Sequence, residues 1–293
     1  MATTRRVASK RAVRVVIAPQ RVVQLTRFVA LPSARPVWTQ RRRYRKEGDA
    51  LKLQAKGPRP LSHHRDLSPV GIPPAERCQV WIDFDGTITT QDVLDELINR
   101  YAMDDSWRKA EELWQRGEIG SRQCLERQFA VVKIASGDLD TFLDRIKPDP
   151  GAGALFSLLQ RAGVPHAVLS DGVDLFINRI LGRHGLKAPV IRSNTIERAG
   201  ERMSLRCPWS DRDCQTAAAH CKCASITTLS DRNRQSIYIG DGRSDLCPSR
   251  KMDFVFAKGR LAESLGSDGI GFIRFKTLAD VTRILEKAWG CND

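Results

Sequence analysis

Carboxylates stand directly after two short apolar runs that are far apart in the chain, at 80–82 and 236–239. Runs of this length, bounded by turn residues, are typical of buried parallel strands. The carboxyl ends of such strands meet at one edge of an open sheet, where ligands bind. Four carboxylates gathered there would repel one another, and a divalent cation that prefers oxygen ligands, such as Mg²⁺, removes that cost. The four residues are Asp83, Asp85, Asp241 and Asp245.

A third apolar run, 166–169, ends in Ser170 and adds a hydroxyl to the same predicted edge. A cation beside carboxylates suits phosphoryl chemistry, because the cation neutralises the phosphate while a carboxylate attacks phosphorus. The residue types and their positions therefore favour an enzyme that acts on a phosphate ester. No histidine is needed for this chemistry, and the five histidines of the chain are not assigned to it.

The elements that must position these side chains alternate along the chain from residue 78 onward. Short apolar runs alternate with amphipathic helical patterns, which predicts an α/β fold with a parallel sheet. We also expect an extended hairpin over 190–205 that turns near 199–200. Ser121 is expected to cap the N-terminus of a helix. Further strands are predicted at 253–257 and 270–275, and helices within 91–146, at 153–163, from 171 to about 182, and at 277–289.

The net charge of +14 belongs to the N-terminal quarter of the chain. Residues 1–77 hold 18 of the 48 Lys and Arg residues but only four of the 34 Asp and Glu residues, which leaves 30 of each sign in 78–293. The charge-balanced part therefore lacks the electrostatic footprint of a nucleic-acid-binding domain. We expect 1–76 to be a basic, disordered extension, with a transit peptide or a cationic binding tail as alternatives.

Three motifs in this order resemble those of the haloacid dehalogenase superfamily of phosphatases with an aspartate nucleophile. DFDGTIT at 83–89 resembles the first motif, Ser170 after Ala-Val-Leu the second, and GDGRSD at 240–245 the fourth. The third motif requires a lysine; Lys222 in His-Cys-Lys-Cys is the candidate and Lys187 the alternative. The resemblance implies a three-layer α/β/α Rossmann-like core over 77–90 and 151–293, with a helical cap over 91–150.

The resemblance also implies a role for each matching residue. Asp83 would be the nucleophile that forms an aspartyl-phosphate, and Asp85 would protonate the leaving group and later deprotonate water. Phosphate-binding residues would be Ser170, Lys222, Gly86 and Thr87. The Mg²⁺ cofactor would be held by Asp83, Asp85 through its backbone carbonyl, Asp241 and Asp245, the last directly or through water.

The substrate is expected to be a small phosphate ester, and the cap would select it and exclude water. Within the phosphoserine-phosphatase-like subgroup, the segments 87–92, 121–124 and 214–223 resemble two branches: methionine-salvage keto-phosphate phosphatases, which we favour, and phosphoethanolamine/phosphocholine phosphatases. Phosphoserine is a further alternative. Asp92 and Arg122 are predicted to contact substrate, with Arg127 as the alternative cation for a substrate carboxylate. A catalytically inactive binding module is the interpretation from another class.

No apolar run is long enough to span a bilayer, and no membrane or nucleic-acid partner is expected. The predicted location is cytoplasmic, or an organelle if the basic N-terminus is a transit peptide.

Most of the eight cysteines are expected to be reduced thiols. Zinc is an alternative for the cluster within 207–223, although its spacing fits no common zinc motif. That cluster is Cys207, Cys214, His220, Cys221 and Cys223.

Overall fold

The computed structural model describes residues 71–291, and the predicted N-terminal extension therefore lies almost entirely outside the described residues. The first described residues lie against the folded part of the chain: Ile72 is buried, and the indole Nε1 of Trp289 donates to the Pro73 carbonyl over 3.1 Å. The expected extension over 1–76 thus ends in a segment that packs on the core. No helix within 71–291 is long and apolar enough to cross a membrane.

A seven-stranded sheet in the order β4-β3-β2-β1-β5-β6-β7 forms the centre of the fold. Every neighbouring pair is parallel except β3 and β4, which form the expected antiparallel hairpin. The predicted α/β class is therefore confirmed. The strands are β1 (Cys78–Ile82), β2 (His166–Val173), β3 (Ile191–Ala199), β4 (Arg202–Arg206), β5 (Gln235–Gly240), β6 (Phe254–Ala257) and β7 (Ile273–Arg274).

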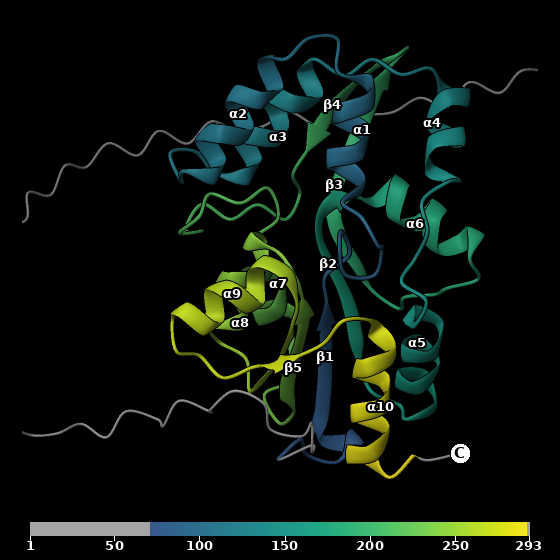
Figure 1. The fold of residues 1–293 in the computed structure, drawn as a ribbon, viewed down its shortest axis with the longest axis vertical. Helices are drawn as coiled ribbons and strands as arrows, with labels where there is room; N and C mark the ends of the chain where they lie inside the picture. The colour runs from purple at the N-terminus through teal and green to yellow at the C-terminus, as the bar shows by residue number, and fades with distance from the viewer. Residues whose placement is uncertain (1–70, 292–293) are drawn as a thin grey trace, which may run out of the picture. The chain divides into compact units, whose positions relative to one another are not determined.

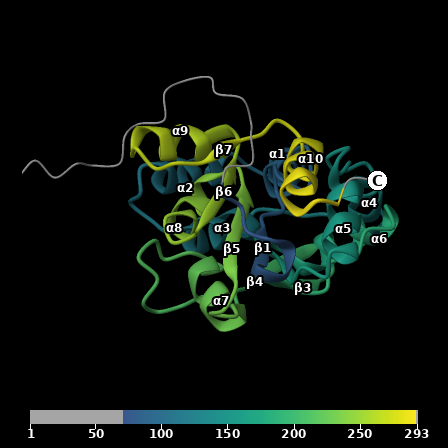
Figure 2. The same cartoon turned by 90° about the horizontal axis from the view of Figure 1, so that it is seen from below.

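Helices cover both faces of this sheet (Figures 1 and 2). The central strand β1 is buried along its whole length, and its side chains alternate between two apolar clusters. Val80 and Ile82 join the cluster that contains α5, α6 and α10, whereas Trp81 joins the cluster that contains α7 and α9. The bounds are α5 (Ala152–Arg161), α6 (Asp174–Arg183), α7 (Lys222–Leu229), α8 (Leu246–Ser249), α9 (Gly259–Ser267) and α10 (Leu278–Trp289).

Four helices between β1 and α5 lie near one end of the sheet, within the span predicted as a cap (Figure 1). They are joined to the β3–β4 hairpin, because α3 contacts β4 and the Ile134 amide donates to the Glu201 carbonyl over 2.9 Å. We call residues 91–150 the cap. Its helices are α1 (Val93–Tyr101), α2 (Ser106–Gln115), α3 (Ser121–Ala130) and α4 (Ser136–Leu143).

Two local expectations differ from the structure. Ser121 was expected to cap α3, but Gly120 is the N-cap and Ser121 is the first helical residue, with its hydroxyl bonded to Asp171 instead. Strand β2 was expected to end at Leu169, but after a shift in its pairing with β3 it continues to Val173. Both differences arise because groups distant in the chain supply the hydrogen bonds.

Candidate active site

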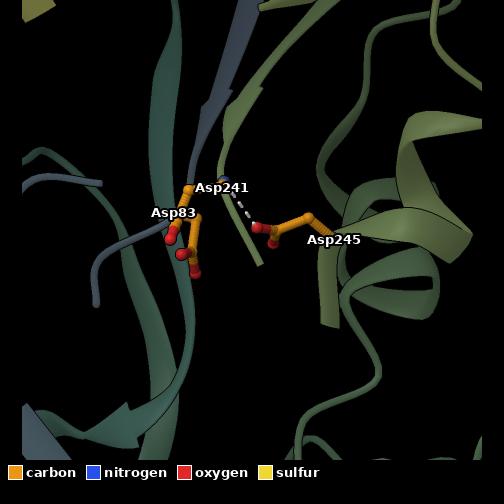
Figure 3. Close-up of side chains that lie close together, drawn as sticks. All are labelled: Asp83, Asp241 and Asp245. Atoms are coloured by element: carbon orange, nitrogen blue, oxygen red, sulfur yellow. Dashed lines mark hydrogen bonds between the residues drawn. The ribbon is translucent and has the colours of Figure 1, made fainter. Parts of the chain in front are cut away.

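The ends of β1 and β5 bring the first and last motifs together. Ile82 pairs with Ile239 in parallel register, so Asp83 and Asp241 leave adjacent strands close to each other. Carboxylate oxygens of Asp83, Asp241 and Asp245 all lie within 4.8 Å of one another. Figure 3 shows Asp83 and Asp241 side by side, with Asp245 reaching toward them from the other side. The predicted convergence of carboxylates is therefore present in the structure.

Lys222 places its ammonium between two of these carboxylates. Its Nζ donates to Asp83 Oδ1 over 2.5 Å and to Asp245 Oδ1 over 2.6 Å, and all three side chains are buried. Burial alone would lower the pKa of Lys222, but the charges of Asp245 and Asp83 outweigh it, and the pKa lies well above its ordinary value. Lys222 is therefore a permanent cation beside Asp83, whereas the alternative, Lys187, is exposed.

Asp245 uses both carboxylate oxygens within the protein. Oδ1 also accepts from the Tyr238 hydroxyl over 2.7 Å, while Oδ2 accepts from the backbone amides of Asp241 and Gly242 over 3.0 and 2.9 Å. Together with Lys222, these donors give the carboxylate four hydrogen bonds. Such an arrangement is suited to holding Lys222 and the loop after β5 in place.

Asp83 and Asp241 each keep one oxygen available. Within 71–291 no hydrogen bond reaches Oδ2 of either residue; Asp241 Oδ1 accepts from the Thr87 hydroxyl over 2.8 Å. Thr87, predicted to bind phosphate, thus orients Asp241. Gly86 has a φ of +71°, and a Cβ there would lie 2.5 Å from Asp241 Oδ2. The Gly86 amide donates within its own turn, to the Gln91 carbonyl, so its visible role is to leave room for Asp241.

Asp85 and Ser170 lie beside each other across β1 and β2. The Ser170 hydroxyl donates to Asp85 Oδ2 over 3.2 Å, and the Val93 amide donates to Asp85 Oδ1 over 3.0 Å. A Cβ at Gly172 would lie 2.7 Å from Asp85 Oδ2 and 2.8 Å from Ser170 Oγ, so glycine provides the space for this pair. Burial raises the pKa of Asp85 well above its ordinary value, and Asp92 adds to the effect. Asp85 is thereby suited to donate a proton.

The donor set fits a hard divalent cation. Burial raises the pKa of Asp83 well above its ordinary value and that of Asp241 to about 6, and Asp245 adds to both shifts. Both shifts arise mainly because burial disfavours the charged carboxylates, and the neighbouring Asp245 adds repulsion that Lys222 does not offset. The available ligand atoms are all oxygens, as Mg²⁺ prefers.

A cavity of about 310 Å³ lies between these residues and the cap. Asp83, Asp85 and Asp241 form part of its wall, and Asp92 also lines it while capping α1 through the Asp95 amide. Arg122 does not line this cavity: its side chain is more than half exposed and pairs with Glu126 over 3.0 Å. The structure thus brings Asp92 to the site and leaves Arg122 on the outer face of α3.

A model of the haloacid dehalogenase-like hydrolase family matches residues 80–248, more than half of the chain. The protein belongs to this family. The match contains the strand ends, Lys222 and the cap. It therefore agrees with the resemblance that the motifs indicated.

Relatives of this haloacid dehalogenase-like hydrolase carry a narrower name. A 2-hydroxy-3-keto-5-methylthiopentenyl-1-phosphate phosphatase from Brevibacillus brevis is 25% identical over 216 residues, covering 73% of this chain and 97% of the relative. The phosphatase of the same name from Bacillus mycoides is 27% identical over 209 residues, covering 69% and 93%. With family membership, these matches identify the chain as a phosphoric monoester hydrolase.

Among solved structures, a substrate-bound phosphoserine phosphatase superposes on the hydrolase with a TM-score of 0.54. It is 17% identical, and the match covers 71% of this chain and 97% of that structure. At this identity the likeness establishes the shared fold.

The half-buried Asp171 and the buried Tyr238 were not predicted to belong to the hydrolase's site, and the buried His220 was considered only as a zinc ligand. His220 Nδ1 donates to the Ser170 carbonyl over 3.0 Å, and in the neutral ring Nε2 accepts from the Ser225 hydroxyl over 2.7 Å. Tyr238 and Asp171 could not be found from spacing, because their partners lie on other elements.

Within the described residues the carboxylate trio is the only group of three metal-ligating side chains close enough to share an ion, so the cysteine cluster gains no zinc site there.

Replacing Lys222 with methionine should destabilise the hydrolase and abolish its activity. The change leaves Asp83 and Asp245 buried without their cation, which costs about 3–5 kcal/mol. Urea denaturation and phosphatase assays measure the two effects, with Lys187→Met as the matched control, expected within about 0.5 kcal/mol of wild type. Equal stability of the two variants would contradict the assigned role of Lys222.

Acid should destabilise the hydrolase partly through His220, because burial lowers the pKa of its imidazole to about 3. The unfolded chain takes up a proton near pH 6.5 while the folded chain does not, so stability is lost as pH falls below about 6.5. From this group alone the free energy of unfolding should fall by about 1.5 kcal/mol between pH 6.5 and 5. Urea denaturation at several pH values gives the free energy of unfolding of wild type and His220→Gln, which should fall less steeply with decreasing pH in the variant. Identical pH dependence in the two proteins would refute the contribution of His220.

Proposed function

We propose that the protein hydrolyses a small phosphate monoester through an aspartyl-phosphate, with Mg²⁺ as cofactor. The observation that carries the proposal is the pairing of two differently held aspartates. Asp83 is buried beside the Lys222 ammonium with Oδ2 available, whereas Asp85 has a raised pKa and faces the cavity. One carboxylate is thereby prepared to attack and the other to donate a proton.

In the first step, Asp83 Oδ2 attacks phosphorus and the bond to the ester oxygen breaks, while Asp85 protonates the departing alkoxide. In the second step, Asp85 takes a proton from water, which displaces Asp83 from phosphorus. Lys222 and Ser170 offset or bind the phosphate oxygens during both steps. Asp83, Asp241 and the Asp85 carbonyl would hold Mg²⁺, with Asp245 in support, and the ion would supply further charge neutralisation when bound.

The favoured substrate is a methionine-salvage-type keto-sugar phosphate. The relatives named for such a phosphatase match this chain over nearly their full length, at 25–27% identity. The cavity wall formed by the cap contains Leu94, Trp114 and Leu125, which offer an apolar surface of the kind that a thioether group needs.

The second candidate is an amine-bearing ester such as phosphoethanolamine or phosphocholine. Asp92, Asp95 and Glu111 line the same cavity, and the described partners of the Glu111 carboxylate are uncharged: Gln115, Gln128 and Cys124. Of the two arginines in the wall, Arg243 already donates to the Gln115 carbonyl. The ammonium group of such an ester would be attracted electrostatically to these acidic side chains, whereas the carboxylate of phosphoserine would be repelled by them.

Release of inorganic phosphate from an aryl phosphate should require Mg²⁺ and disappear in Asp83→Asn. Loss of the nucleophile is expected to lower kcat more than about a thousandfold, and a chelator should abolish wild-type activity. Asp138→Asn, an exposed aspartate of α4, is the matched control. Retained turnover in Asp83→Asn would exclude the aspartyl-phosphate mechanism.

A panel of natural esters should rank the keto-sugar phosphate first by kcat/KM. The panel compares it with phosphoethanolamine, phosphocholine and phosphoserine in wild type and in Glu111→Gln. Because this variant removes a negative charge from the wall, it should lower kcat/KM for the amine esters about tenfold and spare the keto-sugar phosphate. Amine esters turned over faster than the keto-sugar phosphate by wild type would make the second candidate the function.

A further inference from the structure

Three segments that are distant in the chain meet at Asp171, one residue after Ser170. Asp171 Oδ2 accepts from the Ser121 hydroxyl at the start of cap helix α3 over 2.8 Å. Asp171 Oδ1 accepts from the backbone amide of His220 over 2.8 Å. The two oxygens of one half-buried carboxylate therefore bind the cap on one side and the segment before α7 on the other.

Ser121 closes this arrangement into a triangle. While its hydroxyl donates to Asp171, the same oxygen accepts from the Ala219 amide over 3.0 Å. Cap, strand β2 and the segment 219–220 are thus linked by three hydrogen bonds, each pair of segments sharing one. We call Ser121, Asp171 and the backbone of 219–220 the cap latch.

The residues around the cap latch restrict the backbone of its three segments. A Cβ at Gly120 would clash with the backbone carbonyl of Ala217, so the start of α3 lies directly against this segment. Ala217 has a φ of +45°, a conformation that costs free energy outside glycine and persists only when its surroundings impose it. The Asn194 side chain donates to the Asp171 backbone carbonyl over 2.6 Å and so restrains the backbone of Asp171.

The cap latch ends two residues before the lysine at the nucleophile. His220, whose amide binds Asp171, also bonds through its ring to the Ser170 carbonyl and to Ser225 on α7. Lys222 is the first residue of α7. A movement of α3 away from Asp171 would remove a donor from the Asp171 carboxylate on β2 and an acceptor from the Ala219 amide. Ala219 lies in the segment that leads into Lys222.

We propose that Asp171 is a positioning residue that couples closure of the cap to the placement of Lys222. The cap latch makes the closed cap and the correctly placed lysine mutually dependent, so that attack of Asp83 on phosphorus proceeds only when bulk water is excluded. The proposal rests on the phosphatase activity proposed above, but not on which ester is the substrate.

A double-mutant cycle tests the coupling. Ser121→Ala and Asp171→Asn should each lower kcat/KM for an aryl phosphate about tenfold, the effect expected for a hydrogen bond to a charged group. The kcat/KM of the double variant should be no lower than that of the less active single variant, because either substitution breaks the same set of hydrogen bonds. Ser121→Thr, which keeps the hydroxyl, should restore activity, and Ser136→Ala at the start of α4 should match wild type. Losses that multiply in the double variant would overturn the proposal.

Hydrogen exchange of the free protein tests the same coupling without a substrate. In Ser121→Ala, backbone amides at the start of α3 and in 217–222 should exchange faster together, while those of α5 and α10 stay unchanged and so report an intact fold. Faster exchange in α3 with 217–222 unaffected would overturn the cap latch. Absence of phosphate release by wild type would instead refute the proposed function, and the exchange result would be unaffected by it.

Discussion

The ammonium of Lys222, held between the carboxylates of Asp83 and Asp245, is the interaction on which the site depends. A buried charge is tolerated only when it is paired and fully hydrogen-bonded. Here one cation offsets the charge of Asp83 and, through Asp245, is joined to the backbone of the loop after β5. Removing it would leave two buried anions beside Asp241. Helix α7, strand β1 and strand β5 are therefore held in register by electrostatics as well as by packing.

The parallel sheet brings the remaining groups to this cation. Neighbouring parallel strands end at the same edge, so residues more than 150 positions apart become adjacent. Space at that edge is limited, and two glycines provide it: Gly86 makes room for Asp241, and Gly172 for Asp85 with Ser170. Side chains at either glycine would displace carboxylates from the positions that the chemistry requires.

The cap adds what the sheet edge lacks, a cover and a second wall. It is held to the core through Ser121 and Asp171 at one side of the cavity and through Arg243 at the other, where the guanidinium donates to the Gln115 carbonyl and lies over Trp114. The wall above the catalytic aspartates mixes apolar and acidic side chains. The cavity between the cap and the sheet edge therefore has one wall of carboxylates at the strand ends and one wall of mixed apolar and acidic side chains from the cap.

The sequence by itself determined the fold class and the strand-end carboxylates, because short apolar runs followed by polar residues are local signals and parallel strand ends must converge. Lys222 was a candidate through the resemblance to the family's third motif, with Lys187 as the alternative, and the ion pairs of Lys222 with Asp83 and Asp245 distinguish the two. Tertiary structure decided what each side chain does there. Asp245 belongs to the motif, yet its four hydrogen bonds make it a support for Lys222. Serine is a common helix N-cap, but the hydroxyl of Ser121 donates to Asp171, and no local sequence pattern distinguishes these two roles. Arg122 pairs with Glu126 and does not line the cavity. Such roles depend on partners from other elements, and sequence spacing carries no record of those partners.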